Sequence, residues 1–170
     1  MAEHEPNQGN SDDWYTPPAI FDALGLTFDL DPCSPGPEHW VPARKIYTKA
    51  DDGLTKPWDG LVFMNPPFGN REGHLPWLTR FFDHANGIGI VRAYTSSRWW
   101  HKYMPRAEAL LFPHGKTKFI RPDGSIGKSP GHGVVLIGMG EVACNALIKS
   151  KLGMFWRITA DVSAVGASNE

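Results

Sequence analysis

The alternation of apolar and polar positions predicts short strands separated by helices. Thr27–Leu30 alternates as a half-buried strand does, Leu61–Met64 is an apolar run typical of a buried strand, and Leu75–Ala85 has helical spacing. Three further helices are predicted. One runs from Pro17 and Pro18 to about Leu24 with Thr16 as its cap, one runs from Ser96 or Ser97 through Tyr103, and one follows the segment Gly138–Ala143 and ends at Leu152. Further strands are predicted at Ile88–Ala93, Ala109–Phe112, Lys116–Ile120, Val134–Ile137 and Phe155–Thr159, and a loop at Cys33–Tyr47. This succession indicates an α/β domain with a mainly parallel sheet flanked by helices.

Composition narrows the class of protein. The 170 residues suit one domain, and 41% hydrophobic with 21% charged residues is a globular profile. We expect this domain at residues 13–160, between a flexible acidic tail at 1–12 and a flexible C-terminal tail at 161–170. No apolar run is long enough to span a membrane, and the two cysteines form no CxxC pair, so we expect a reduced, cytoplasmic protein. The scattered histidines predict no metal site.

Charge is distributed unevenly along the chain. The net charge is −1, yet residues 1–31 hold seven acids and no Lys or Arg, whereas residues 92–128 hold eight Lys or Arg and two acids. This asymmetry is compatible with a polyanion bound on one face, although a solvated basic surface is, from the charge alone, the preferred explanation.

The most specific motif follows the apolar run at Leu61–Met64. It is Asn65-Pro66-Pro67-Phe68, followed by Gly69. Two prolines impose a rigid extended turn whose carbonyls are available to a ligand. The Asn65 amide oxygen and the Pro66 carbonyl could each accept one N–H of an exocyclic amine on a flat base, with Phe68 stacked on that base. A rigid turn without chemistry is the alternative.

Five segments in a fixed order resemble the phage-type DNA N6-adenine methyltransferase family, the Dam-like group. They are Asp13–Pro17, Leu30–Cys33, Asp52–Leu54, Asn65–Gly69 and Thr95–Trp100. The resemblance covers about Asp13 to Ile137. It implies an abridged Rossmann-like fold without a separate target-recognition domain. It also implies methyl transfer from S-adenosylmethionine to adenine N6 in DNA, with the target base flipped out or single-stranded.

The resemblance also implies roles for individual residues. Asn65, Pro66, Pro67 and Phe68 are the expected catalytic residues. The expected cofactor residues fall in three groups. These are Tyr15, Thr16 and Pro17 over the methionine part, Asp31 with Pro32 and Cys33 at its amino end, and Asp51, Asp52, Gly53 and Leu54 at the adenine. A plain helix cap at Thr16 and a surface turn at Asp52-Gly53 are the structural alternatives.

Candidate DNA contacts combine basic and aromatic side chains. They are Arg92, Arg98, Trp99, Trp100, Lys102, Lys116, Lys118, Arg121 and Lys128. Trp99 and Trp100 are equally compatible with core positions. Phosphate contacts carry no sequence information, so these residues predict DNA as a partner without predicting a target sequence.

The chain departs from the family pattern in places. Phe68 stands where Tyr is commoner, and Gly115–Phe119 stands where an Arg-containing segment is usual. The short stretch between Cys33 and Asp51 leaves little room for the usual helix and second strand that carries the ribose-binding acid, and Glu38 is the only acid within it.

Three other functions fit parts of the sequence. An Asn-Pro-Pro-aromatic motif also serves methylation of RNA adenine or protein glutamine. Gly138–Ala143 matches the GxGxxA pattern of an NAD-binding oxidoreductase. A non-catalytic DNA-binding protein is the third, and the intact Asn65 argues against it.

Overall fold

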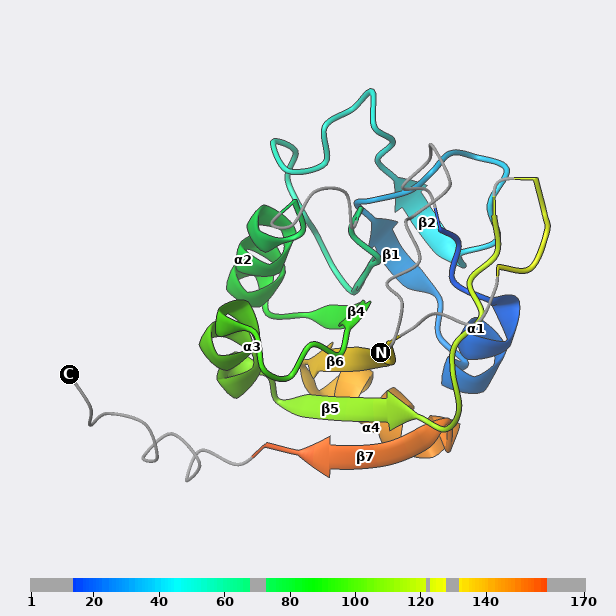
Figure 1. The fold of residues 1–170 in the computed structure, drawn as a ribbon. Coiled ribbons are helices and arrows are strands. Elements are labelled where there is room, and N and C mark those ends of the chain that lie inside the picture. Colours follow the sequence, from blue (N-terminus) through cyan, green and yellow to red (C-terminus); the bar gives the residue numbers. More distant parts are fainter. Residues whose placement is uncertain (1–13, 68–72, 122, 128–131, 159–170) are drawn as a thin grey trace, which may run out of the picture.

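A seven-stranded sheet organises the part of the chain that the computed structural model describes, which is residues 14–67, 73–121, 123–127 and 132–158 (Figure 1). The strand order is β2-β1-β3-β4-β6-β5-β7. The strands are β1 (Phe28–Asp31), β2 (Ala43–Ile46), β3 (Val62–Met64), β4 (Gly87–Arg92), β5 (Ala109–Pro113), β6 (Val134–Met139) and β7 (Gly153–Arg157). The helices are α1 (Pro18–Leu24), α2 (Leu75–His84), α3 (Arg98–Tyr103) and α4 (Glu141–Ser150), with a 3₁₀ turn, η1 (Met104–Arg106). The two predicted tails, Phe68 and Lys128 lie outside the described residues.

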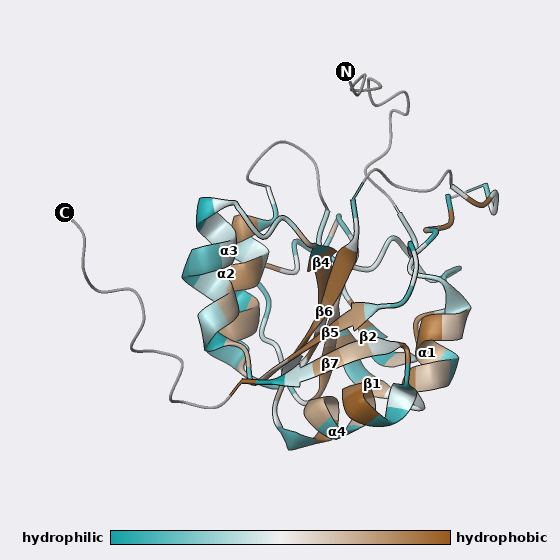
Figure 2. Cartoon of the chain, turned by 60° about the horizontal axis from the view of Figure 1, so that its bottom comes forward, coloured by the Kyte–Doolittle hydropathy of each residue, from teal (hydrophilic) through white to brown (hydrophobic). Residues whose placement is uncertain are grey.

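Helices cover both faces of the sheet. Figure 2 shows the apolar strands β4 and β6 between one layer made of α2 and α3 and another made of α1 and α4. Side chains of successive strand residues point to opposite faces, so Val62 and Met64 pack on the α2 side while Phe63 packs on the α1 side. The prediction of an α/β domain with a sheet flanked by helices is therefore confirmed.

The prediction of a mainly parallel sheet is wrong. β1 pairs in parallel with β2 and β3, and β3 pairs in parallel with β4. β6 is antiparallel to both β4 and β5, and β7 is antiparallel to β5. The cause is that β6, inside the sheet, and β7, at its edge, run in the direction opposite to the other five strands. Apolar runs cannot reveal this, because a strand buried on both faces has the same composition in either direction.

Three local predictions also need correction. Cys33–Tyr47 is not all loop, since Ala43–Ile46 forms the edge strand β2. Lys116–Ile120 forms no strand, and Ile120 makes isolated bridges to Tyr15 and Ile126 instead. Thr16 does not cap α1, whose N-cap is Pro17. Ser97, by contrast, caps α3 as expected by accepting a hydrogen bond from the Trp100 amide at 3.3 Å.

The connection from β1 to β2 bears on the site. A loop replaces the helix that usually joins two such parallel strands, as the short spacing and the prolines predicted. The second strand is present nevertheless, and the Tyr47 amide donates to the Asp31 carbonyl at 2.9 Å. The loop therefore lies next to the carboxyl end of β1, the edge at which ligands of open α/β sheets bind.

Candidate active site

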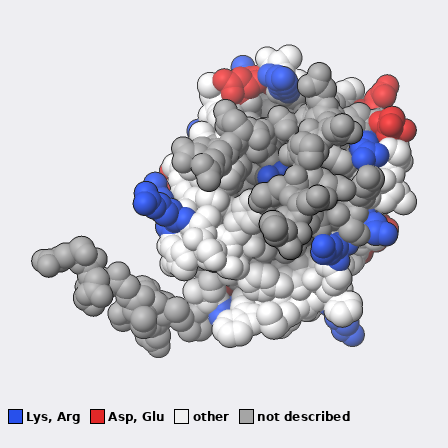
Figure 3. Space-filling view, in the orientation of Figure 1, with Lys and Arg blue, Asp and Glu red and all other residues white. Residues whose placement is uncertain are grey.

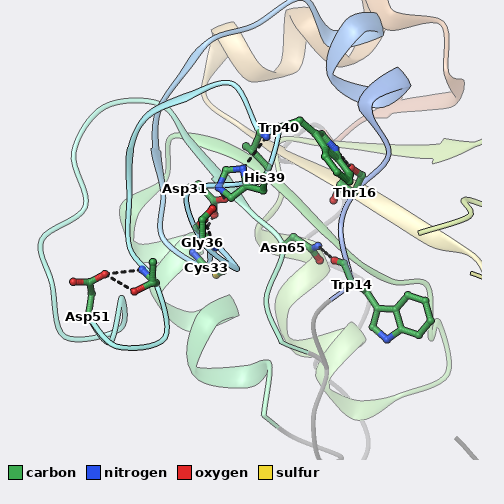
Figure 4. Close-up of polar contacts among 12 residues, drawn as sticks. Trp14, Thr16, Asp31, Cys33, Gly36, His39, Trp40, Asp51 and Asn65 are labelled. Carbon is green, nitrogen blue, oxygen red and sulfur yellow. Dashed lines mark hydrogen bonds and ion pairs between the residues drawn. The ribbon is translucent and has the colours of Figure 1, made fainter. Parts of the chain in front are cut away.

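A cavity of about 520 Å³ lies at the carboxyl ends of β1 and β3. Most of its lining comes from four segments that are distant in sequence: the residues before α1, the loop after β1, the turn near Asp52 and the turn after β3. Trp77 on α2 lines it as well. Ten predicted site residues are among its lining, namely Tyr15, Thr16, Asp31, Pro32, Cys33, Asp52, Gly53, Asn65, Pro66 and Pro67. The fold thus places seven of the predicted cofactor residues and the Asn-Pro-Pro turn around one space, and Figure 4 shows Thr16, Asp31, Cys33 and Asn65 among them.

Three predicted cofactor residues do not line the cavity. Pro17 is the N-cap of α1, and Leu54 is half-buried outside the lining. Asp51 is exposed and accepts hydrogen bonds from the Thr48 amide at 2.8 Å and the Thr48 hydroxyl at 2.7 Å, so it closes a turn. These bonds lower the pKa of Asp51. Glu38, the only acid available for a ribose, is exposed and also outside the lining.

Asn65 is held in one orientation. Its amide nitrogen Nδ2 donates to the Trp14 carbonyl at 2.8 Å, which assigns the two ends of the amide (Figure 4). Its oxygen Oδ1 is buried and has no hydrogen-bond partner among the described residues. A buried acceptor without a partner is costly, so its presence at a cavity indicates a ligand donor.

Trp14 is itself fixed by a second segment. The Arg121 guanidinium lies over the Trp14 ring at 5.5 Å, and the backbones of Tyr15 and Ile120 exchange hydrogen bonds at 2.8 and 2.9 Å. Gly127 lies so close to the Trp14 ring that a Cβ at this position would meet Trp14 at 2.6 Å. Arg121, which is a predicted DNA contact, therefore packs on the residue whose carbonyl orients the Asn65 amide.

Asp31 ends β1 at the wall of the cavity. It is 3% exposed, and its Oδ1 accepts from the Cys33 amide at 3.0 Å. Burial raises the pKa of the Asp31 carboxyl to about 7, although the Cys33 amide acts in the opposite direction. A carboxylate kept in such a place is well suited to a cationic ligand group, which would restore the charged form.

The turn at Asp52 and Gly53 is tightly packed. Asp52 has a positive φ of 53°, a conformation that Asp tolerates better than most residues. A Cβ on Gly53 would collide with the Pro32 carbonyl, and the Gly53 carbonyl accepts from the Trp58 indole at 2.8 Å. Gly53 therefore permits the turn to sit directly against the Asp31-Pro32 segment.

His39 and Trp40 are two of the lining residues that were not predicted. The His39 imidazole lies 3.5 Å from Asp31 Oδ2, and the Trp40 indole donates to the Thr16 carbonyl at 2.7 Å. Both stand in the proline-rich loop, where no hydrophobic period marks inward-facing side chains. The sequence carries no signal for them beyond the presence of a His-Trp pair in that loop.

The predicted DNA contacts are distributed unevenly between surface and core. Arg98, Lys102, Lys116 and Lys118 are exposed, and Arg92 is half-buried. Trp100 is buried in the core under α3, as its alternative interpretation proposed, while Trp99 is half-buried and edge-on to His74. On the face seen in Figure 3, the Lys and Arg side chains lie in separate groups.

The GxGxxA segment joins β6 to α4. Packing and backbone conformation account for its two glycines. A Cβ on Gly138 would meet Leu147 at 2.7 Å, and Gly140 has a φ of 83°. β6 is antiparallel to both of its neighbours, whereas a dinucleotide fingerprint joins neighbouring parallel strands. Its carboxyl end at Met139 pairs with Gly87, which starts β4, so it lies at the edge opposite the cavity.

Two further classes of feature are not found in the described residues. None of their helices has both the length and the apolar composition to cross a membrane. They also contain no group of three or more His, Cys, Asp or Glu side chains placed to hold a metal ion.

Comparison with known proteins agrees with the geometry. Residues 4–138 match the family model described as DNA N-6-adenine-methyltransferase (Dam). No curated protein and no solved structure gives a match. The match spans most of the chain, including all four segments that line the cavity. The chain therefore belongs to the DNA N-6-adenine-methyltransferase (Dam) family.

Proposed function

We propose that this protein transfers a methyl group from S-adenosylmethionine to the N6 amine of adenine in DNA. The observation that carries the proposal is the buried Oδ1 of Asn65, which has no hydrogen-bond partner in the part of the chain that the structure describes and lies on the same cavity as the buried Asp31 carboxyl. The family match supports adenine methylation in DNA as the general activity. Our proposal concerns the methyl donor, the flipping of the target adenine out of the duplex and the roles of single residues.

The cavity fits the proposed methyl donor. Its volume of about 520 Å³ lies in the range of small-molecule sites. Asp31 offers an acceptor to an ammonium group, and the Thr16 hydroxyl is buried without a partner among the described residues. Asp52, which also lines the cavity, offers an acceptor to an adenine amine. Apolar surface comes from Phe63 and Trp77.

The chain's own residues account for the activation of the target amine. The lone pair of an exocyclic amine is delocalised into its ring, so the amine is a weak nucleophile. Asn65 Oδ1 and the Pro66 carbonyl would accept its two N–H groups, which favours a pyramidal nitrogen and stabilises the positive charge that develops there. S-adenosylmethionine, when bound, supplies a methyl group made electrophilic by its sulfonium. As the nitrogen–methyl bond formed, the methyl–sulfur bond would break and S-adenosylhomocysteine would leave. The alkylated nitrogen is acidic and would release one proton to water, so no strong base is required.

The target base must leave the duplex, because its amine is inaccessible inside a base pair. We propose that Arg98 and Lys102 on α3, with Lys116 and Lys118, contact phosphates, and that Phe68 stacks on the flipped adenine. The first four are exposed. The proposal for Phe68 rests on its place after Pro67 in the family motif.

Incubation with methyl-labelled S-adenosylmethionine and double-stranded DNA, followed by nucleoside analysis, tests the proposed function. We expect label in N6-methyl-2′-deoxyadenosine released from DNA. Parallel reactions with RNA and with protein separate the alternatives. Label in RNA or in glutamine, with none in DNA, would contradict DNA as the substrate and would still support S-adenosylmethionine as the methyl donor. Stabilisation by NAD instead of S-adenosylmethionine in a thermal-shift assay would favour the oxidoreductase interpretation.

The raised pKa of Asp31 predicts a pH-dependent affinity for the cofactor. Below a pKa of about 7 the free carboxyl is protonated, and an ammonium ligand must displace that proton. The dissociation constant for S-adenosylhomocysteine should therefore be roughly tenfold higher at pH 6 than at pH 8 and level off above pH 7. Titration calorimetry across this range measures it. Asp31→Asn should abolish the pH dependence of the dissociation constant. If the same pH dependence persists in that variant, another titratable group causes it.

A further inference from the structure

His39 and Asp31 form a buried pair at the wall of the cavity. Their side chains are 5% and 4% exposed, and 3.5 Å separates His39 Nε2 from Asp31 Oδ2 (Figure 4). Asp31 Oδ1 is engaged by the Cys33 amide, but His39 Nε2 has no hydrogen-bond partner among the described residues. A buried polar atom of this kind beside a cavity calls for an explanation.

The other ring nitrogen shows which form of His39 is present. Nδ1 accepts a hydrogen bond from the Val41 amide at 2.9 Å, so Nδ1 carries no proton. Burial lowers the pKa of His39, which favours the neutral ring. A neutral imidazole with a bare Nδ1 carries its proton on Nε2. His39 therefore presents an N–H donor next to the Asp31 acceptor.

The loop holds this donor firmly. The Val41 bond fixes the ring, and Trp40 ties the loop to the Thr16 carbonyl at 2.7 Å. The neighbouring Ser34 side chain is occupied within the same loop, because its hydroxyl accepts from the Gly36 amide at 3.1 Å and donates to the Gly36 carbonyl at 3.2 Å. His39 is thus the group of this loop that remains available to a ligand.

A donor and a carboxylate side by side complement an α-amino acid, whose carboxylate and ammonium are joined through one carbon. On the basis of the proposed function, we propose that His39 binds the carboxylate of the amino-acid end of S-adenosylmethionine through Nε2–H, while Asp31 binds its ammonium. Lys49 also lines the cavity, but it is exposed and lacks such fixed geometry. His39 is then a binding residue for the cofactor and takes no part in the transfer itself.

Calorimetry with two ligands tests this assignment. One ligand is S-adenosylhomocysteine, and the other is its decarboxylated analogue, which keeps the amine and lacks the carboxylate. His39→Ala should weaken S-adenosylhomocysteine about 10- to 100-fold, the effect of losing a hydrogen bond to a charged group, and leave the analogue within about threefold. His39→Gln, which can still place an N–H donor there, should recover part of the loss. Lys49→Ala is the control and should affect neither ligand strongly.

Each other outcome is informative. Equal losses for both ligands in His39→Ala and His39→Gln would show that His39 only supports the loop. A carboxylate-dependent loss in Lys49→Ala, with none in His39→Ala, would assign the carboxylate to Lys49. If the wild-type protein binds neither ligand, the proposed function fails and this proposal fails with it. Thermal unfolding of each variant verifies that the binding data come from folded protein.

Discussion

Asn65→Ala will lower the rate of methyl transfer about 100- to 1,000-fold, the usual effect of removing one preorganised polar contact from a developing charge. The substitution removes the buried Oδ1 that has no partner among the described residues, and with it an acceptor for the target amine. The affinity for S-adenosylhomocysteine should change little, because Asn65 is assigned to the target and Asp31 to the cofactor. Single-turnover kinetics with labelled cofactor and DNA, together with calorimetry, measure the two effects separately.

A matched control for this variant is Asn145→Ala. Asn145 is exposed on α4, in the layer that covers the opposite face of the sheet from α2 and α3, and its loss should not affect transfer. Asn65→Asp should have intermediate activity, since it keeps an acceptor for the amine and loses the donor to the Trp14 carbonyl. Full activity in Asn65→Ala would remove Asn65 from the catalytic site.

Asp31→Asn will raise the dissociation constant for S-adenosylhomocysteine at least about 30-fold at pH 8. Truncating one partner of a buried, hydrogen-bonded charge pair costs about 2–5 kcal/mol in binding. The amide keeps an acceptor for the Cys33 amide, so the turn after β1 should persist. Calorimetry at pH 8, where the native carboxyl is ionised, measures the loss.

Stability provides an independent measurement on the same variant. Because the folded-state pKa of Asp31 is raised, its ionisation opposes folding. This penalty builds up as pH rises from the unfolded-state pKa of about 4 to the folded-state pKa of about 7, and it is fully present at pH 8. Asp31→Asn should therefore unfold at the same temperature as the wild type or higher at pH 8. A large drop in unfolding temperature would show that lost binding reflects a damaged fold.

Asp29 is the matched control, two residues earlier on the same strand. Its carboxylate accepts from the Leu61 amide at 2.8 Å and pairs with Arg44, and these contacts lower its pKa. Asp29 therefore stabilises the fold above its unfolded-state pKa, and this contribution is lost as pH falls. Asp29→Asn should lower the unfolding temperature at neutral pH and leave S-adenosylhomocysteine binding unchanged. Equal binding losses in Asp29→Asn and Asp31→Asn would contradict a specific role for Asp31.

The parts of the fold that could be predicted are those that local chemistry determines. The apolar run before Asn65 ends at two prolines that cannot extend a ladder, and β3 ends there. The apolar spacing of Leu75–Ala85 matches α2 within one residue. Motif order along the chain likewise grouped Asp31, Asp52 and Asn65, which the fold brings to one cavity.

The missed features depend on tertiary contacts. β2 has the sequence Ala-Arg-Lys-Ile with two exposed side chains, so pairing with β1 and not hydrophobicity makes it a strand. The direction of β6 depends on which neighbours it joins, which composition does not encode. His39 faces the cavity because Val41 and Asp31 surround its ring, and both contacts arise only when the loop folds over the end of β1.

The bond between Asn65 and the Trp14 carbonyl has a consequence for how the protein acquires its activity. Trp14 is held by Arg121 and by the Tyr15–Ile120 bridge. The orientation of the Asn65 amide therefore depends on segments from three distant parts of the chain. Closing such long loops is entropically unfavourable until the final contacts compensate for it. The Asn-Pro-Pro turn can form early, while β3 folds, but its orientation is completed late. A nascent chain that has not yet emerged as far as Ile120 carries the motif without a functioning site.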